Sequence, residues 1–184
     1  FYQTLLGFWP DQVPHGDERE RRIKRVQNYM LKAVREAKLH TSWISPYEPY
    51  ERAVTSFVAE VLNEHRRGAF LADIRAFAQK IADHGYWNSL SQLLLKVVSP
   101  GVPDFYQGTE TWSLTLVDPD NRQPVDFATA RQRLDELQRR LGADGSAERL
   151  GLMSELVQQR ADGRIKLFTT HMSLRARRSL PQLF

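Results

Sequence analysis

The 184-residue sequence is long enough for one domain with a sizeable core, or for one domain and part of a second. Its 41% hydrophobic and 26% charged residues are ordinary for a globular protein. The absence of cysteine excludes disulfides and cysteine-bearing zinc sites, and it agrees with a cytoplasmic location. Because no apolar run approaches the ~20 residues that span a bilayer, we expect no membrane partner.

The formal net charge of +4 raises the question of a nucleic-acid partner. Most arginines alternate with acidic residues, as between residues 131 and 140, which is typical of a solvated helix face. We therefore expect no nucleic-acid partner. Two arginine clusters, at 19–25 and 175–178, depart from this pattern. They leave open an alternative function, an all-helical binding module that docks acidic partners or nucleic acid.

Both ends of the sequence are apolar. Residues 1–9 form an apolar helix-like run, and residues 180–184 read Leu-Pro-Gln-Leu-Phe. Because natural termini are usually polar, we expect the sequence to be a fragment of a longer chain. Residues 10–16 are rich in turn formers and predict a linker. Periodic apolar side chains then predict a helix over 17–39, with an acidic capping-box-like start.

The middle of the sequence predicts further helices. A second long helix is expected to begin at Ser45, or at Pro49, and to end near Gly68. An amphipathic helix is predicted over 70–82. Gly85 is expected to break it, because glycine weakens a helix interior.

The next predicted helix covers 88–98, with Leu94 on its buried face and Asn88 or Ser89 as its cap. Two prolines then bracket a turn into a short apolar strand at 104–107. Three more helices follow a polar loop, at 127–141, 147–160 and 164–178. The chain is therefore expected to be mainly α, with one strand.

Polar and aromatic side chains crowd the end of the predicted strand and the loop that follows it. Sugar sites combine planar hydrogen-bonding side chains, which bind hydroxyl pairs, with aromatic faces for the apolar side of a pyranose ring. In α/β barrels such groups stand at the carboxyl ends of strands. The alternative is a strand end that simply packs under a loop. The predicted substrate-binding residues are Tyr106, Gln107, Glu110, Trp112, Asp118, Asp120, Asn121 and Arg122.

The acidic part of this loop has some of the residues of a calcium-binding loop but not its full pattern. A calcium loop needs oxygen ligands at alternating positions, a central glycine and a terminal glutamate. Arg122 stands where the third ligand should be, and Gln123 and Thr129 replace the glycine and the glutamate. The histidines lie far apart, without metal-ligand spacing. We expect no metal and no cofactor.

Residues 40–43, His-Thr-Ser-Trp, form a second polar and aromatic cluster between two predicted helices. One interpretation is a helix-to-helix turn around a buried tryptophan, Trp43. The other interpretation is a substrate-facing role for His40 and Trp43. The sequence favours neither.

Several segments together resemble the maltooligosyltrehalose synthase family of the α-amylase superfamily. They are residues 1–7, 32–43, 84–92, 99–110 and 118–122. These segments stand in the family's order and span nearly the whole chain. The resemblance implies the closing portion of a (β/α)8 barrel, also called a TIM barrel, including its last helix–strand–helix units and a helical insertion.

The resemblance also implies an activity. Family enzymes convert the reducing-end α-1,4 bond of a maltooligosaccharide into the α,α-1,1 bond of trehalose by intramolecular transglucosylation with retention. They are therefore isomerases of carbohydrate metabolism and trehalose biosynthesis. An aspartate nucleophile, a glutamate acid/base and a second aspartate carry out the reaction. All three lie upstream of the position of Phe1, so we expect no catalytic residue in this sequence and no activity from the fragment alone.

The resemblance divides the sequence into three parts. Residues 1–9 would end a preceding barrel unit, residues 10–82 would form a helical insertion, and residues 83–184 would form a barrel segment with the eighth strand, the polar loop and covering helices. The expected partners are the maltooligosaccharide substrate and the remainder of the barrel. Self-association is also expected, because some apolar side chains have few partners in this sequence. These are Phe1, Leu5, Phe8, Val102 and Phe105.

Overall fold

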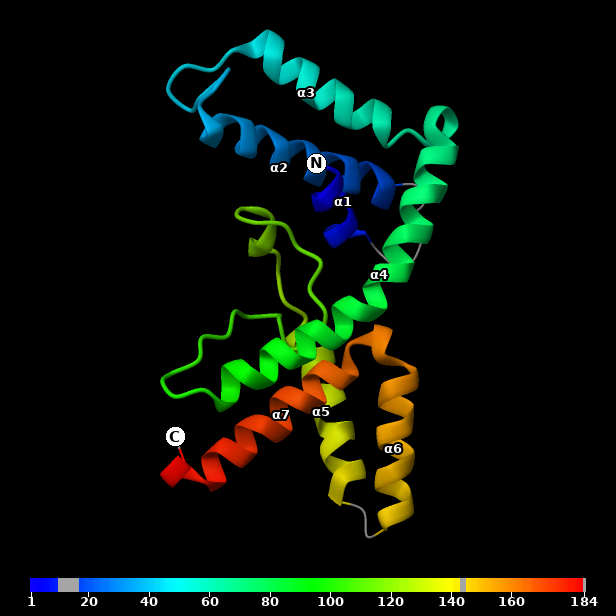
Figure 1. Cartoon of the computed structure of the whole chain (residues 1–184), viewed down its shortest axis with the longest axis vertical. Helices are drawn as coiled ribbons and strands as arrows, with labels where there is room; N and C mark the ends of the chain where they lie inside the picture. The colour runs from blue at the N-terminus through cyan, green and yellow to red at the C-terminus, as the bar shows by residue number, and fades with distance from the viewer. Residues whose placement is uncertain (10–16, 143–144, 184) are drawn as a thin grey trace. The chain divides into compact units, whose positions relative to one another are not determined.

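The structure, a computed structural model, describes residues 1–9, 17–142 and 145–183, and it is mainly helical (Figure 1). The predicted linker at 10–16 lies outside the described residues. No helix in the described ranges is long and apolar enough to cross a membrane. The α-helices are α1 (Tyr2–Phe8), α2 (Asp17–Ala37), α3 (Glu48–Val61), α4 (Glu64–Val98), α5 (Phe127–Gly142), α6 (Ser146–Gln158) and α7 (Arg164–Ser179). Short 3-10 helices are η1 (Asp120–Arg122), η2 (Arg160–Asp162) and η3 (Pro181–Leu183).

The predicted strand at 104–107 is wrong for this structure. These residues are irregular, and the described part of the chain contains no β-strand. A strand is stabilised by the hydrogen bonds of a neighbouring strand, and a lone extended segment has none. The apolar character of the segment is therefore not sufficient to make it a strand in this chain.

Helix α4 is longer than the sequence predicts. The preceding helix, α3, ends at Val61 rather than near Gly68, and α4 begins where the side chain of Asn63 accepts a hydrogen bond from the His65 N–H at 3.0 Å. Gly85 lies inside α4 and does not break it, so no cap at residue 88 or 89 is used. Glycine costs a helix about 1 kcal/mol relative to alanine, which packing readily outweighs.

The chain divides into two compact units. The first unit comprises Phe1–Ile81 and Leu114–Gln123, and the second comprises Ala82–Ser113 and Pro124–Phe184. The division falls within α4. The assignment of residues 1–9, 10–82 and 83–184 to parts of a barrel stays a prediction.

The core of the first unit forms where α1 packs with α2, α3 and the start of α4. Helices α2 and α3 lie side by side as a hairpin (Figure 1). Leu5 and Phe8 of α1 are buried there together with Val26 of α2 and Val58 of α3. The expectation that Leu5 and Phe8 lack partners is therefore wrong, because the α2–α3 hairpin supplies the apolar surface that covers them.

The core of the second unit forms between α4, α5, α6 and α7. Its buried side chains are Leu90, Leu137, Leu152, Leu156, Ile165 and Leu167. Leu94, which was predicted to be buried, is 46% exposed. Val102 is almost fully exposed, whereas Phe105 is half-buried. Of the apolar side chains on which the expected self-association depends, Val102 is thus exposed and Phe105 partly so. Self-association stays a prediction.

Candidate functional site

The predicted substrate-binding residues fall into both compact units. Tyr106, Gln107, Glu110 and Trp112 belong to the segment 99–113 in the second unit. Asp118, Asp120, Asn121 and Arg122 belong to the loop 114–123 in the first unit. Each set therefore lies within a single unit.

Asp120 anchors the loop 114–123 to α2. Its carboxylate accepts two hydrogen bonds from Arg25, at 2.7 and 2.8 Å, and one from the Leu116 N–H at 2.6 Å. Gln123 adds a longer one at 3.3 Å. A bidentate arginine–carboxylate pair with a backbone donor is a strong, directional arrangement. Asp120 therefore holds the loop in place.

The electrostatics of Asp120 agree with this structural role. Burial by itself would raise the pKa of the Asp120 carboxyl, because it disfavours the charged form. The hydrogen bonds from Arg25 and from the Leu116 N–H outweigh burial and hold the pKa below its ordinary value. Asp120 is thus an ionised anchor, not a proton donor near neutral pH.

Asp118 and Arg122 lie on the solvent side of the same loop. Their side chains form an ion pair, in which the Arg122 side chain is 69% exposed. On α2, Lys32 donates a hydrogen bond to the Asp118 carbonyl at 2.7 Å. The buried Oδ1 of Asn121 has no hydrogen-bond partner among the described residues. Arg122 is therefore the member of this set that is freest to contact a ligand.

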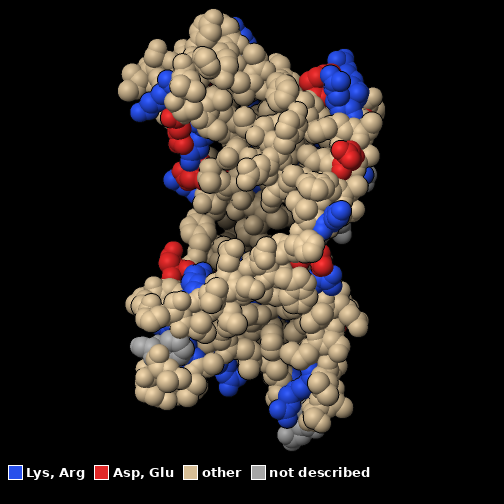
Figure 2. All heavy atoms as spheres, in the orientation of Figure 1, with Lys and Arg blue, Asp and Glu red and all other residues tan. Residues whose placement is uncertain are grey.

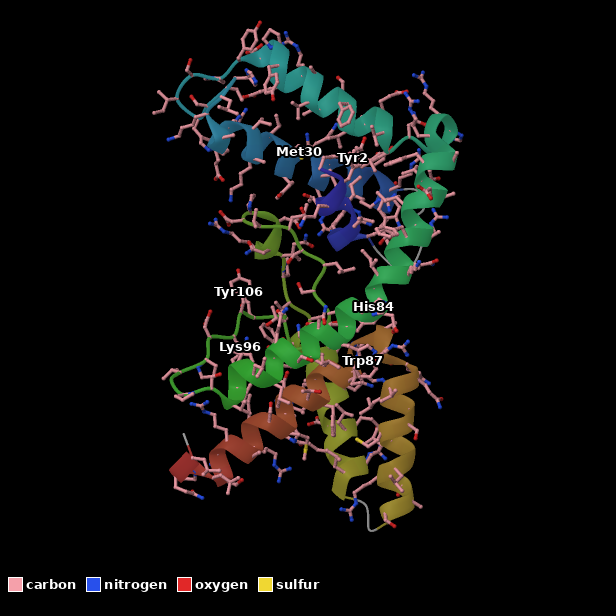
Figure 3. All side chains as sticks on the ribbon, viewed as in Figure 1. Tyr2, Met30, His84, Trp87, Lys96 and Tyr106 are labelled. Carbon is pink, nitrogen blue, oxygen red and sulfur yellow. The ribbon has the colours of Figure 1, made fainter. Side chains whose placement is uncertain are left out.

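Tyr106 and Gln107 sit at an exposed turn of the segment 99–113. Both the backbone N–H and the hydroxyl of Thr109 donate to the Tyr106 carbonyl, at 3.2 and 2.6 Å. Gly108 follows with φ +79°, a conformation that favours glycine. The Lys96 ammonium of α4 donates to the Asp104 carbonyl at 2.9 Å. Figure 3 shows Lys96 on the helix and Tyr106 on the segment that follows it. The turn therefore presents its two polar side chains to solvent.

Trp112 is half-buried and braces the second unit. Its indole N–H donates to the Arg160 carbonyl at 2.7 Å, and its ring stacks on Tyr86 with centroids 4.9 Å apart. At Gly163, which has φ +81°, a Cβ atom would lie 3.0 Å from the Trp112 backbone nitrogen. The backbones around Trp112 thus approach so closely that only glycine fits at position 163.

Lys166 of α7 lies beneath the same stretch. Its ammonium donates to the Thr111 carbonyl at 3.2 Å and lies 5.5 Å from the centroid of the Trp112 ring. Burial lowers the pKa of Lys166 and the nearby Lys96 lowers it further, whereas Glu110 opposes the shift. Glu110 therefore acts as part of the electrostatic environment of a partly buried lysine.

The residues that position these loops were missed at the sequence level. They are Arg25, Lys32, Lys96 and Lys166, each on a helix; all but Lys96 stand more than 50 residues along the chain from the group they bind. No local motif marks such a side chain. A basic residue at a polar helix position looks the same whether it faces solvent or holds a loop.

The cluster at 40–43 lies in the loop between α2 and α3. Trp43 is 57% exposed, so its interpretation as a buried tryptophan is wrong. Thr41 is the buried member, because its hydroxyl donates to Glu51 at 2.7 Å inside the hairpin. Among the residues that the structure describes, no group of three histidine, aspartate or glutamate side chains could hold a metal ion.

Members of both arginine clusters are engaged within the chain. The guanidinium of Arg22 lies 4.7 Å from the centroid of the Trp9 ring, and that of Arg25 lies 4.5 Å from Phe8. In the second cluster, Arg177 donates to backbone carbonyls at the end of α4 and just beyond it. Figure 2 shows basic atoms beside acidic ones in several places on one face of the chain. These contacts do not favour a module that docks acidic partners through the clusters.

Comparison with known proteins shows which enzymes the chain resembles. A curated Mycobacterium tuberculosis protein, assigned by name to the maltooligosyl trehalose synthases, is 37% identical over 137 residues, which are 74% of this chain and 17% of that protein. A crystal structure of a maltooligosyl trehalose synthase matches 98% of this chain and 22% of its own, with a TM-score of 0.78 and 33% identity. The structure of the Arthrobacter ramosus maltooligosyltrehalose synthase matches 100% of this chain and 21% of its own length, with a TM-score of 0.74 and 34% identity.

Over nearly its whole length, the chain is similar to a segment of maltooligosyl trehalose synthases. It spans about a fifth of the length of the synthases that it matches. No family model matches the sequence. The resemblance to maltooligosyl trehalose synthases predicted from the sequence is therefore confirmed.

Proposed function

We propose that this chain is a segment of an enzyme that converts the reducing-end α-1,4 bond of a maltooligosaccharide into the α,α-1,1 bond of trehalose. The observation that carries the proposal is the match to maltooligosyl trehalose synthases at 33–34% identity along nearly the whole chain. The enzyme would be an intramolecular transferase, a class of isomerase, in trehalose biosynthesis. A cytoplasmic location is part of the proposal, supported by the absence of cysteine.

The reaction sets requirements that this chain can meet only in part. The bond between C1 of the penultimate glucosyl unit and O4 of the reducing-end glucose breaks as the acid/base glutamate protonates O4, and the glucosyl C1 bonds to the carboxylate nucleophile. The C1 hydroxyl of the released glucose then gives its proton to the same glutamate and attacks the glucosyl C1, which frees the carboxylate and forms the 1,1 bond. Water is neither consumed nor released. The glucose must therefore be held and turned while water is excluded, and the carboxylates are proposed to lie outside this chain.

The chain's own contribution is proposed to be binding and orientation of the sugar. Tyr106, Gln107 and Arg122 support this role because their polar side chains are exposed on loops whose backbones are fixed. Asp120 and Trp112 support it indirectly, by holding those loops. A fixed loop matters because a misplacement of about 1 Å can cost on the order of a hundredfold in rate.

The segment 104–107 is proposed to become the eighth strand of a (β/α)8 barrel when the rest of the synthase is present. Its two aromatic residues, Phe105 and Tyr106, support this proposal because aromatic residues are common in strands, and the missing requirement is a neighbouring strand. The remainder of the barrel would then be the first partner of this chain. The polar side chains at 106–110 would stand at the carboxyl end of that strand, where barrel enzymes place their sites.

A chimera tests the proposed function. The matching fifth of the Arthrobacter ramosus synthase is replaced by this chain, and the purified protein is incubated with maltopentaose. Loss of reducing ends without release of glucose is the expected result, because transfer converts a reducing end into a non-reducing trehalosyl end. The intact synthase and the synthase with the segment deleted are the controls. A folded chimera that leaves every reducing end intact contradicts the proposal.

A further inference from the structure

We propose that the loop 38–47 between α2 and α3 is a carbohydrate-binding platform, on which Trp43 stacks against a glucosyl ring of a maltooligosaccharide. The choice of sugar rests on the proposed function. The eight predicted substrate-binding residues lie outside this loop, whose substrate-facing role was one of the two interpretations of residues 40–43. Its aromatic side chains are unusually accessible, with Trp43 57% and Tyr47 56% exposed.

A partly buried ion pair holds the base of the loop. Arg35 of α2 donates two hydrogen bonds to the Glu51 carboxylate of α3, at 2.8 and 2.6 Å, and Thr41 donates a third at 2.7 Å. The Thr41 hydroxyl in turn accepts from the Tyr47 N–H at 2.9 Å. The two ends of the loop are thus tied to one carboxylate. Ordering a loop in advance removes an entropic cost from ligand binding.

The tip of the loop is closed by two serines on either side of the exposed side chains. The Ser42 N–H donates to the Ser45 carbonyl at 3.2 Å, and the Ser45 N–H donates to the Ser42 hydroxyl at 2.9 Å. Trp43 and Ile44 lie between these bonds and point outward, since Ile44 is almost fully exposed. A loop that fixes its backbone while exposing large apolar side chains indicates a binding surface.

Arg35 sets the orientation of the Trp43 ring. The guanidinium of Arg35 lies 4.8 Å from the centroid of the Trp43 ring, a cation–π distance. Because Glu51 holds the Arg35 guanidinium in place, the contact with that guanidinium holds the ring in place as well. Arg35 covers one face of the ring, and the large exposed area of Trp43 leaves the other side open to a ligand.

The surroundings of Trp43 favour a sugar over a purely apolar partner. A pyranose ring has an apolar face bordered by hydroxyls, so its site needs an aromatic face with hydrogen-bonding groups nearby. His40 and Ser45 in the same loop, and Glu48 at the start of α3, are exposed and offer such groups. The competing occupant is another part of the synthase that covers Trp43, and the experiment below distinguishes the two.

The test is maltopentaose binding to the folded 184-residue chain, followed by tryptophan fluorescence and by saturation-transfer NMR. Trp43→Ala is expected to weaken binding about tenfold or more, because the stacking surface is lost. Trp43→Tyr should keep most of the affinity. Trp87→Ala is the matched control, since Trp87 on α4 is also an exposed tryptophan near an arginine, 6.0 Å from Arg160 (Figure 3). The control should bind as the unchanged chain does.

The outcomes separate the platform from the proposed function. Unchanged affinity in Trp43→Ala, or no maltopentaose binding by the unchanged chain, overturns the platform and points to Trp43 as a surface covered by another part of the synthase. Neither result affects the chimera experiment. An inactive chimera together with Trp43-dependent binding leaves the platform standing and removes only the transglucosylation proposal.

Discussion

Arg25 on α2 and Asp120 in the loop 114–123 are joined by two hydrogen bonds although they stand 95 residues apart in the sequence. The pair links that loop to the α2–α3 hairpin. In the sequence, its arginine and aspartate look like ordinary polar residues. Its strength can be measured.

Asp120→Ala is expected to destabilise the protein by about 1–3 kcal/mol, because it leaves Arg25 and the Leu116 N–H without their acceptor. Urea unfolding followed by circular dichroism measures the change. Arg122→Ala serves as the control, since it breaks an exposed ion pair worth about 0–1 kcal/mol. Equal losses in the two variants would show that Asp120 does not anchor the loop.

Gly163→Ala should cost more than about 2 kcal/mol. An alanine there adopts a left-handed conformation and brings its Cβ within 2.9 Å of the Thr111 Cβ. Gly151→Ala in α6 is the matched control, because its Cβ meets open space within a helix. That variant should gain about 0.5–1 kcal/mol. Thermal unfolding of both variants compares them, and a tolerated alanine at 163 would mean that the Trp112 region is looser than described.

The Glu51 ion pair predicts a specific dependence on pH. Hydrogen bonds from Arg35 and then from Thr41 lower the pKa of Glu51 from 4.5 to about 2. A depressed carboxyl pKa stabilises the fold fully above about pH 4.5, and this stabilisation is lost as the pH falls toward 2. Glu51→Gln should therefore be less stable than the unchanged chain at pH 7, with the difference shrinking below pH 4.5. A difference that does not depend on pH would contradict the assignment.

The chain by itself is expected to leave maltopentaose unchanged. On the proposal that the catalytic carboxylates lie outside this chain, no glycosyl intermediate can form in it, whatever sugar the loops bind. A reducing-end assay over hours at high protein concentration measures this, with an active maltooligosyl trehalose synthase as the positive control. Turnover that copurifies with the chain, and that survives repurification, would show that the required groups are present here.

Prediction from sequence worked where local pattern alone determines structure. The helix expected over 164–178 is α7, Arg164–Ser179, because apolar spacing defines it and Gly163 marks its start. It failed at Gly85, where a modest local penalty is outweighed by packing along α4, and at 104–107, where a strand needs neighbours. The reason in both cases is that the deciding partners are remote.

The candidate site shows the same limit. The polar and aromatic composition of 106–122 suggests a ligand, but it cannot distinguish an exposed Arg122 from an anchoring Asp120. That distinction depends on which helix lies behind each loop. The substrate-binding role of these residues stays a prediction. The exposure of Trp43 was likewise open in the sequence, because a tryptophan between two helices fits a core as well as a surface.

Lys96 has a consequence for how the free chain behaves in solution. Its ammonium donates a hydrogen bond to the Asp104 carbonyl and lies 3.9 Å from the centroid of the Phe105 ring. An extended apolar segment is otherwise a template on which a second copy can add a strand. With that acceptor taken and a positive charge beside the ring, the segment is a poorer seed for edge-to-edge aggregation. In the free chain, Lys96 thus blocks a backbone acceptor in the segment that the proposed barrel would enclose.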